Sequence, residues 1–207
     1  MPKYSFKTQA FTLIELVMTM AIAGILVTIA IPSFNSTLTS SRLTNYANDL
    51  VGALNLARSE AVRRGVSVTV RKLDNDSYTK IGPGVNWETG WDIFTDINND
   101  GKFDVGDELI RTYVAQQSSY LHSSYTLRGN NNFANYIRYT PLGTSNSIGS
   151  FVICDNSDGN NAPEAYTSKL ITINFSGRPH MGVDSNDNGI PEKENGTEII
   201  SCTVSPF

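Results

Sequence analysis

Carboxylate and amide side chains recur in one short stretch of this chain at a spacing that suits a calcium ion. They stand at Asp96, Asn98, Asp100, Asp104 and Asp107, and Gly101 takes the sixth position of the series. Alternate oxygen ligands in a tight loop converge on one cation, and a glycine at this position permits the sharp turn. Strand-like runs flank the stretch, so a metal-free Asn/Asp/Gly hairpin stays open as the other interpretation. The stretch 184–192 resembles calcium turns more loosely.

The sequence carries none of the residue patterns that are typical of enzymes. It has two histidines, and it lacks the H-E-x-x-H, G-x-S-x-G, phosphate-loop, dinucleotide-binding and C-x-x-C motifs. With 16 basic and 20 acidic residues the net charge is −4, which argues against a surface that binds nucleic acid throughout. We therefore expect a chain without enzymatic activity.

Residues 11–31 form a nearly unbroken apolar run. As a helix, this run is long enough to cross a bilayer core of roughly 30 Å. It holds one charge, Glu15, and a carboxylate inside such a span costs about 2.5–3.5 kcal/mol even on a lenient insertion scale. Glu15 therefore needs a partner or a function. Lys3 and Lys7 precede the run, which predicts an N-terminus in the cytoplasm and the remainder of the chain outside it.

This N-terminal region resembles that of type IV prepilins, with a short basic leader, a small residue and then F-T-L-I-E-L. In that family a peptidase cleaves after the small residue, here Ala10, and methylates the new N-terminus, here Phe11. The resemblance implies that Glu15, the fifth residue after cleavage, pairs with the charged N-terminus of a neighbouring subunit. Pro32 stands where pilins carry a helix-kinking proline. Ala10 replaces the glycine that is usual before the cut.

Two simpler interpretations of the apolar run fit less well. A secretory signal has an apolar stretch of about 7–15 residues, whereas this run is longer and contains an acid. A plain single-span anchor fits the length but gives Glu15 no role.

Beyond Pro32 the apolar residues become one-sided at a helical repeat, as far as a glycine C-cap at Gly65. From residue 66 the period changes to two, and the strand candidates are 66–72, 91–96, 108–114, 123–128, 136–140, 150–155, 169–175 and 198–204. We expect an α+β fold that is type IV pilin-like, with one long N-terminal helix, membrane-embedded in its first half, packed on an antiparallel β-sheet domain. Its parts are a leader (1–10), a membrane and filament-core helix (11–31), an amphipathic continuation (32–65) and a periplasmic β-rich domain (66–207).

The second half of the helix, with its A-R-S-E-A-V stretch, is similar to that of the FimT, FimU and GspH group of minor pilins. FimT proteins carry a G-R-x-R motif that is implicated in DNA binding. Gly177 and Arg178 match this motif, whereas His180 replaces the second arginine. Because histidine is largely neutral near pH 7, one permanent phosphate contact is lost. A turn with a solvated arginine is therefore the alternative to a DNA site.

Cys154 and Cys202 lie in two of the later strand candidates. A small, even number of cysteines in a domain outside the cytoplasm predicts one disulfide. It would close a loop of about 48 residues, which stabilises a fold by about 4 kcal/mol in the chain-entropy model. Metal ligation is the alternative, but no further His or Cys stands at ligand spacing nearby.

These resemblances imply a minor pilin or pseudopilin of the FimT/FimU/GspH group, single-pass in the inner membrane and part of a filament after assembly. The expected partners are other pilins or pseudopilins through the N-terminal helix, the prepilin peptidase and the inner membrane, with DNA as a further candidate. Calcium is the candidate cofactor. Three roles stay open: a pilus subunit at or near the tip that primes assembly, a type II secretion pseudopilin of the GspH type that aids protein export, and a direct DNA-binding subunit.

Overall fold

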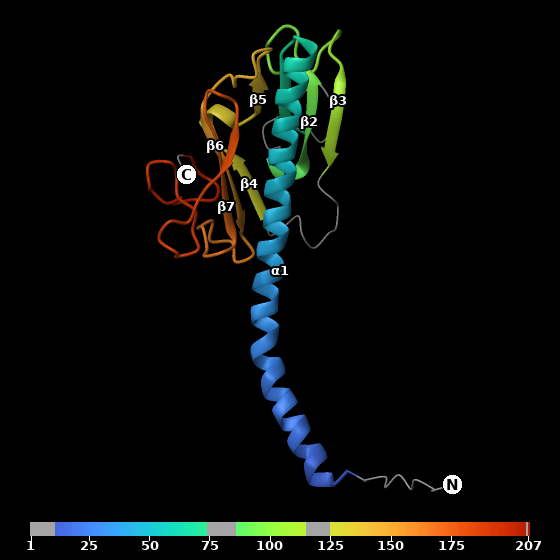
Figure 1. Ribbon diagram of the computed structural model, residues 1–207, viewed down its shortest axis with the longest axis vertical. Helices are drawn as coiled ribbons and strands as arrows, with labels where there is room; N and C mark the ends of the chain where they lie inside the picture. Colours follow the sequence, from blue (N-terminus) through green and yellow to red (C-terminus); the bar gives the residue numbers. More distant parts are fainter. Residues whose placement is uncertain (1–10, 74–85, 115–124, 206) are drawn as a thin grey trace, which may run out of the picture. The chain divides into compact units, whose positions relative to one another are not determined.

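The structure is a computed structural model that describes residues 11–73, 86–114, 125–205 and 207, without the side chains of Pro32, Ser33 and Asn131. It divides into two compact units, Met1–Leu38 and Thr39–Phe207. One helix, α1 (Leu13–Arg64), runs through most of the described part of the first unit and continues into the second (Figure 1). The predicted leader, residues 1–10, lies outside the described residues.

Both ends of α1 are fixed by local chemistry. At its start the Thr12 hydroxyl accepts a hydrogen bond from the Glu15 amide at 3.3 Å, which satisfies one of the free N–H groups of a helix N-terminus. At its end Gly65 takes the left-handed conformation with φ 69° and donates its N–H to the Ala61 carbonyl at 3.0 Å. The predicted glycine C-cap at Gly65 is therefore confirmed.

The β-strands of the described residues form two four-stranded sheets, and every pairing among them is antiparallel. Sheet A has the order β3-β2-β1-β5, with bounds β1 (Val68–Lys72), β2 (Gly90–Thr95), β3 (Leu109–Val114) and β5 (Tyr136–Tyr139). Sheet B has the order β4-β6-β7-β8, with bounds β4 (Tyr125–Gly129), β6 (Gly149–Asp155), β7 (Ser168–Ile173) and β8 (Pro179–Met181). Two short 3-10 helices, η1 (Trp87–Thr89) and η2 (Asn131–Phe133), precede β2 and β5.

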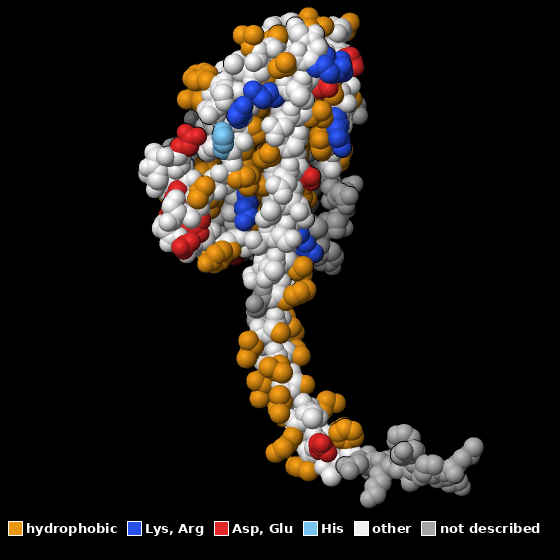
Figure 2. Space-filling model, viewed as in Figure 1, with side chains coloured by type: hydrophobic (Ala, Val, Ile, Leu, Met, Phe, Trp, Pro, Cys, Tyr) orange, Lys and Arg blue, Asp and Glu red, His pale blue; other side chains and the backbone are white. Residues whose placement is uncertain are grey.

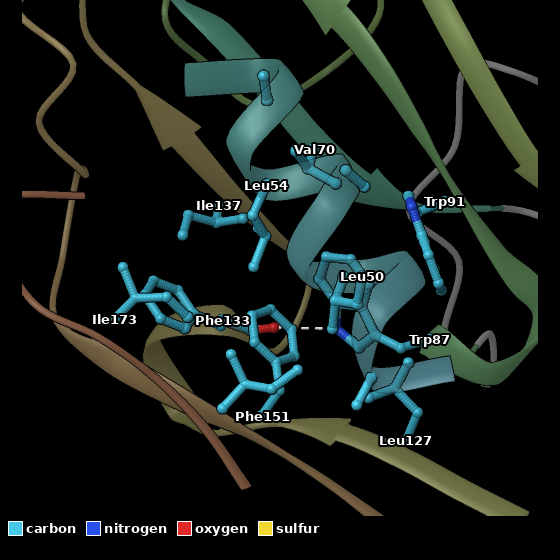
Figure 3. Close-up of a cluster of buried hydrophobic side chains, with 14 of the residues drawn as sticks. Leu50, Leu54, Val70, Trp87, Trp91, Leu127, Phe133, Ile137, Phe151 and Ile173 are labelled. Atoms are coloured by element: carbon cyan, nitrogen blue, oxygen red, sulfur yellow. Dashed lines mark hydrogen bonds between the residues drawn. The ribbon is translucent and has the colours of Figure 1, made fainter. Parts of the chain in front are cut away.

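The core of the second unit lies between α1 and the inner faces of both sheets (Figure 3). The helix buries a stripe at helical spacing, formed by Leu43, Ala47, Leu50, Ala53, Leu54, Ala57 and Ala61. Sheet A contributes apolar side chains such as Val70 and Ile137, and sheet B contributes Phe151. The buried Trp87 donates its indole N–H to the Phe133 carbonyl at 3.0 Å, so its polar atom is satisfied. Residues of α1 near 34–38 lie in the other unit and take no part in this core.

The C-terminal segment corrects one predicted strand. Residues 198–204 form no strand, because their backbone bonds go to loops instead of to a neighbouring strand: the Cys202 amide donates to the Asn161 carbonyl at 3.0 Å. Their apolar side chains nevertheless cover the outer face of sheet B, where Ile199, Cys202 and Phe207 pack against Val152 and Leu170. The alternation of apolar residues thus predicted correctly that side chains of this segment are buried. Its prediction that the segment pairs as a strand was wrong. One edge strand of sheet B is β8, which the sequence pattern did not predict.

Candidate functional site

The first unit offers a long apolar helical surface. Side chains from Leu13 to Ile31 are exposed, and the helix contains a window of mean hydropathy 2.4 with no buried share (Figure 2). By length and composition this helix can cross a membrane. The hydroxyls of Thr19 and Thr28 donate to the backbone carbonyls of Leu16 and Ile25 at 2.8 and 2.7 Å. These polar groups are therefore satisfied within the helix itself.

Glu15 differs from these threonines. Within the described residues its carboxylate has no hydrogen-bond or ion-pair partner, although its backbone N–H is bonded to the Thr12 hydroxyl. The motif T-L-I-E therefore also begins the helix, in the manner of the first half of a capping box. A carboxylate in the first turn interacts favourably with the helix dipole, by about 0.3–1 kcal/mol at an exposed site. This stabilisation by the helix dipole is smaller than the free-energy cost of placing a charge in lipid, so Glu15 still requires a partner.

The other predicted residues of the leader and helix are only partly described. Ala10 lies outside the described residues, and Phe11 is exposed and precedes the first residue of α1. Pro32 lies within the continuous helix Leu13–Arg64, while its side chain is outside the described part of the chain. The cleavage, methylation and kink that were predicted for these residues stay predictions.

The loop 96–108 is organised around one buried carboxylate (Asp96 is fully buried). Asp96 accepts hydrogen bonds from the Thr69 hydroxyl at 2.7 Å and from the amides of Asp100 and Gly101 at 3.0 Å each. The Arg138 guanidinium stands 3.7 Å away. Because its oxygens already bind three donors, Asp96 holds the loop to sheet A whether or not a cation is present.

The remaining predicted calcium ligands also bind parts of the loop. Asp107 accepts the amides of Ile97 and Asp104 at 3.0 Å each, and Asp100 accepts the Lys102 amide at 2.8 Å. Asn98 donates its side-chain amide to Asp104 at 3.3 Å. Within the described residues no group of His, Cys, Asp or Glu side chains is arranged to hold a metal ion. Calcium binding in this loop stays a prediction.

The second acidic stretch folds in the same way as the first. Asp184 accepts the amides of Asn188 and Gly189 at 3.1 and 2.7 Å, which are the same relative positions that Asp96 binds. Asp187 and Gly189 have positive φ angles of 60° and 87°, as do Asn99 and Gly101, at 62° and 76°. The shared D-x-N-x-x-G spacing therefore specifies this loop conformation. A hairpin without a metal ion explains the same spacing.

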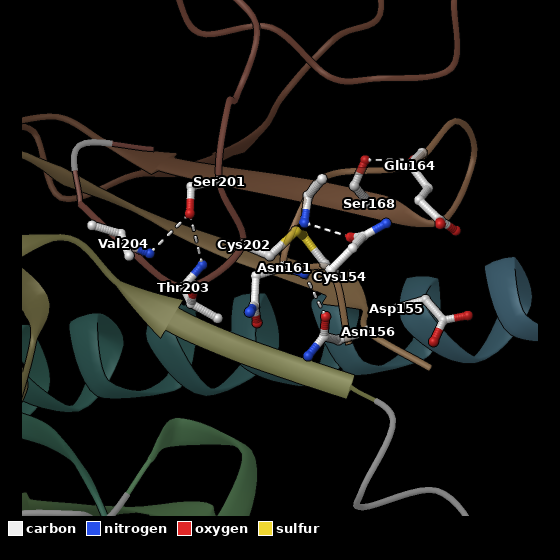
Figure 4. Close-up of a disulfide and its surroundings, with 12 residues drawn as sticks. Cys154, Asp155, Asn156, Asn161, Glu164, Ser168, Ser201, Cys202, Thr203 and Val204 are labelled. Atoms are coloured by element: carbon white, nitrogen blue, oxygen red, sulfur yellow. Dashed lines mark hydrogen bonds between the residues drawn. A yellow bond between two sulfur atoms is a disulfide. The ribbon is translucent and has the colours of Figure 1, made fainter. Parts of the chain in front are cut away.

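The predicted disulfide forms between Cys154 and Cys202, with a Cα–Cα distance of 5.8 Å (Figure 4). Cys154 lies on β6, and Cys202 lies in the C-terminal segment, so the bond fastens this segment to the outer face of sheet B. Both residues are fully buried. The described residues contain no free cysteine.

The predicted DNA-binding residues lie at the start of β8. Arg178 and His180 are exposed, and Gly177 is buried in the preceding turn with φ 73°. A Cβ atom on Gly177 would lie 2.4 Å from the Gly143 carbonyl oxygen, so the glycine of this motif has a structural cause. The same carbonyl accepts a hydrogen bond from Arg58 Nε at 2.8 Å. Arg58 of α1 thus lies beside the turn that carries Arg178.

Two family models match the chain. The model of the type II transport protein GspH matches residues 46–177, which is more than half of the chain. The chain belongs to the GspH family. The model of the prokaryotic N-terminal methylation motif matches residues 5–31 of this GspH-family protein. The second match covers the cleavage and methylation motif that the sequence predicted.

Solved structures show the same fold. The type IV minor pilin FimU of Pseudomonas aeruginosa, in one crystal form, is 19% identical to the GspH-family protein, with a TM-score of 0.50, and the match covers 78% of this chain and 96% of that one. A second crystal form of FimU gives 18% identity and a TM-score of 0.47, over 77% and 98% of the two chains. A search of the curated proteins finds no match. The chain is thus a minor pilin or pseudopilin, with one long N-terminal helix and antiparallel sheets.

Two residues at these sites were not predicted. Thr12 caps the N-terminus of α1, and the T-x-x-E spacing from Thr12 to Glu15 is the signal that indicates this cap. Arg58 binds a carbonyl 85 residues away in the sequence, and no local pattern indicates such a contact. Only the folded structure shows this hydrogen bond of Arg58.

Proposed function

We propose that this GspH-family protein is a minor pilin, a structural subunit at or near the tip of a type IV pilus, where it primes filament assembly for adhesion, motility or DNA uptake. One observation carries the proposal. The exposed apolar helix of the first unit keeps a single carboxylate, Glu15, without a partner among the described residues. A carboxylate in this setting is stable when a neighbouring subunit supplies a cation, and a charged, methylated N-terminus at Phe11 is such a cation.

The same reasoning leads to a proposed cellular location and a proposed cleavage of the leader. The protein is a single-pass protein of the inner membrane, with a cytoplasmic N-terminus and a periplasmic β-domain, until the prepilin peptidase cuts between Ala10 and Phe11 and the chain enters a filament. Mass spectrometry of membrane-extracted protein should find N-methylated Phe11 as the first residue. A mature chain that begins at Met1, in cells with an active peptidase, contradicts this proposal.

The assembly role is tested by Glu15→Val, with Thr19→Val as the matched control. The bond at the start of α1 uses the backbone N–H of Glu15, which the substitution leaves in place. Thr19 has the same helical surroundings, but its hydroxyl is already satisfied by the Leu16 carbonyl. We expect both variants to insert into the membrane and only Glu15→Val to be missing from sheared filaments. Normal incorporation of Glu15→Val is the result that refutes the pairing role.

A pseudopilin of a type II secretion system is the second candidate, because the family model that matches carries the name of such a protein. Both machines use the same kind of helix, so the distinction needs a phenotype. Deletion of the gene should abolish surface pili and leave protein export intact if the first proposal holds. Loss of export with normal pili favours the secretion system.

Direct binding of DNA is the third candidate, and the exposure of Arg178 and His180 beside Arg58 supports it. Few phosphate contacts are available, so binding should be weak, independent of sequence and lost as salt rises. Titration of labelled duplex DNA with detergent-solubilised protein tests this candidate, with Arg178→Ala beside wild type. If wild type and Arg178→Ala bind DNA equally at low and at high salt, the motif at Gly177 and Arg178 does not bind DNA.

A further inference from the structure

The C-terminal segment lies across the outer face of sheet B without belonging to the sheet. We call residues 199–205 together with Phe207 the strap. Two backbone hydrogen bonds join the strap to the other described residues, from the Ile199 amide to the Pro191 carbonyl at 3.5 Å and from the Cys202 amide to the Asn161 carbonyl at 3.0 Å. Both acceptors lie outside the strands, so no strand ladder holds the strap in place.

Apolar packing is the second attachment of the strap. Its buried side chains are Ile199, Cys202 and Phe207, and they pack against Val152 and Leu170. This cluster shares no residue with the larger one that lies between α1 and the inner faces of both sheets. The larger core is therefore complete without any side chain of the strap.

The Cys154–Cys202 disulfide is the third attachment, and it joins the strap to β6, which has a neighbouring strand on both sides (Figure 4). Ile200 and Val204 are 75% and 67% exposed and contribute little to the packing. Once the disulfide is broken, two backbone bonds and a few buried side chains must offset the conformational entropy of the whole ordered strap. The disulfide is thus the attachment on which the position of the strap depends.

We propose that this disulfide is a redox-sensitive switch. Its reduction releases the strap and uncovers the apolar side chains of Val152 and Leu170, while the core between α1 and the sheets stays folded. The reduced chain then differs from the oxidised chain in the surface that it presents and not in its fold. The inference goes beyond the proposed function and does not depend on which filament the protein joins.

The chemistry of release is thiol–disulfide exchange with a dithiol reductant. One thiolate of the reductant attacks a sulfur of the Cys154–Cys202 bond, which breaks this bond, forms a mixed disulfide and releases the other cysteine as a thiolate. The second thiol of the reductant then displaces the remaining cysteine. The protein gains two electrons and two protons as two thiols, and the reductant is oxidised to a disulfide. Because both cysteines are fully buried, the strap must move away from β6 before the attack.

Hydrogen exchange of the full-length, detergent-solubilised protein tests the release. In dithiothreitol the strap amides should exchange at least about tenfold faster than in the oxidised protein, while the amides of α1, β6 and β7 keep their rates. The chain has two cysteines, so alkylation followed by mass measurement shows how far the bond is reduced. The variant that carries both Cys154→Ala and Cys202→Ala should exchange like the reduced wild type.

The rate of reduction tests whether the strap protects the bond. Ile199→Ala removes a side chain that is 2% exposed, and Ile200→Ala removes its neighbour, which is 75% exposed. In dithiothreitol the two thiols of Ile199→Ala should appear about tenfold faster than those of wild type, because the loss of packing raises the population of the open strap. Ile200→Ala should keep the wild-type rate.

Four outcomes overturn the inference. They are a disulfide that stays intact in dithiothreitol without denaturant, unchanged exchange of the strap amides in fully reduced protein, loss of protection in α1, β6 and β7 together with the strap, and equal rates of reduction for Ile199→Ala and Ile200→Ala. Each of them leaves the proposed function standing, because the incorporation of Glu15→Val into filaments tests that function independently.

Discussion

The substitution Asp96→Asn removes one charge from the centre of the loop 96–108 and changes almost no volume. Asp96 is fully buried, and its two oxygens accept bonds from Thr69, Asp100 and Gly101. An asparagine has only one oxygen, so its NH₂ group must face at least one of these donors. The substitution therefore makes two hydrogen-bond donors face each other inside the protein.

The cost follows from those bonds. A hydrogen bond to a charged group contributes about 1.5–3 kcal/mol, and a buried donor left without an acceptor costs a similar amount. We expect Asp96→Asn to lower the free energy of unfolding by about 3 kcal/mol. For a domain of this size the melting temperature should fall by about 6–12 °C. Thermal unfolding of detergent-solubilised protein in a chelating buffer measures this without any contribution from calcium.

The matched control is Asp100→Asn. Asp100 accepts the Lys102 amide, a bond that an asparagine oxygen accepts equally well, and its ion pair with Lys102 Nζ at 3.9 Å is exposed to solvent and contributes little. In the chelating buffer it should melt within about 1 °C of wild type. A loss below about 1 kcal/mol for Asp96→Asn refutes the central role of this carboxylate. Addition of millimolar calcium then tests the metal separately: a bound cation raises the melting temperature of wild type, and Asp100→Ala, which removes the ligand oxygen, should lose that gain.

Three further predictions concern stability. Replacement of both Cys154 and Cys202 by alanine should cost about 4 kcal/mol for the 48-residue loop, measured by denaturant unfolding; a loss below about 1 kcal/mol contradicts it. Gly177→Ala should destabilise by about 1–3 kcal/mol in the same assay, because its Cβ meets a backbone oxygen at 2.4 Å and φ is 73°, whereas Gly196→Ala, with open space at φ 77°, should cost less. The hydrogen bonds from two arginines lower the pKa of Glu60 to about 2, so the stabilisation that Glu60 provides is present above about pH 4.5 and is lost as the pH falls towards 2. Glu60→Gln should therefore reduce the loss of stability over this pH range, measured at low salt. An unchanged loss of stability in the variant counts against the pairing.

The helix and most of the strands could be predicted from the sequence because their signals are local. The glycine at 65, the one-sided apolar repeat before it and the alternation after it depend on neighbouring residues alone. The disulfide followed from the number of cysteines and the expected compartment. The loop 96–108 was recognised as a turn rich in oxygen ligands, and the structure added that Asp96 is buried.

The parts that the sequence did not predict depend on long-range contacts. The segment 198–204 alternates like a strand, yet the disulfide and the packing of Ile199 hold it across sheet B instead of in its ladder. β8 is only three residues long and begins with a proline, so it carries no strand pattern. The contact between Arg58 and Gly143 joins elements that no sequence motif links.

The order of the strands has a consequence for how the domain folds. β4 belongs to sheet B, whereas β5, which follows it, returns to pair with β1 of sheet A. The ladder between β1 and β5 can therefore form only after Tyr139 has been synthesised, when most of the chain is present. Pairing at such separation makes folding slow, and an unpaired edge of β1 is exposed in the interval. No single cut of the chain separates the two sheets, so the domain should unfold as one cooperative unit.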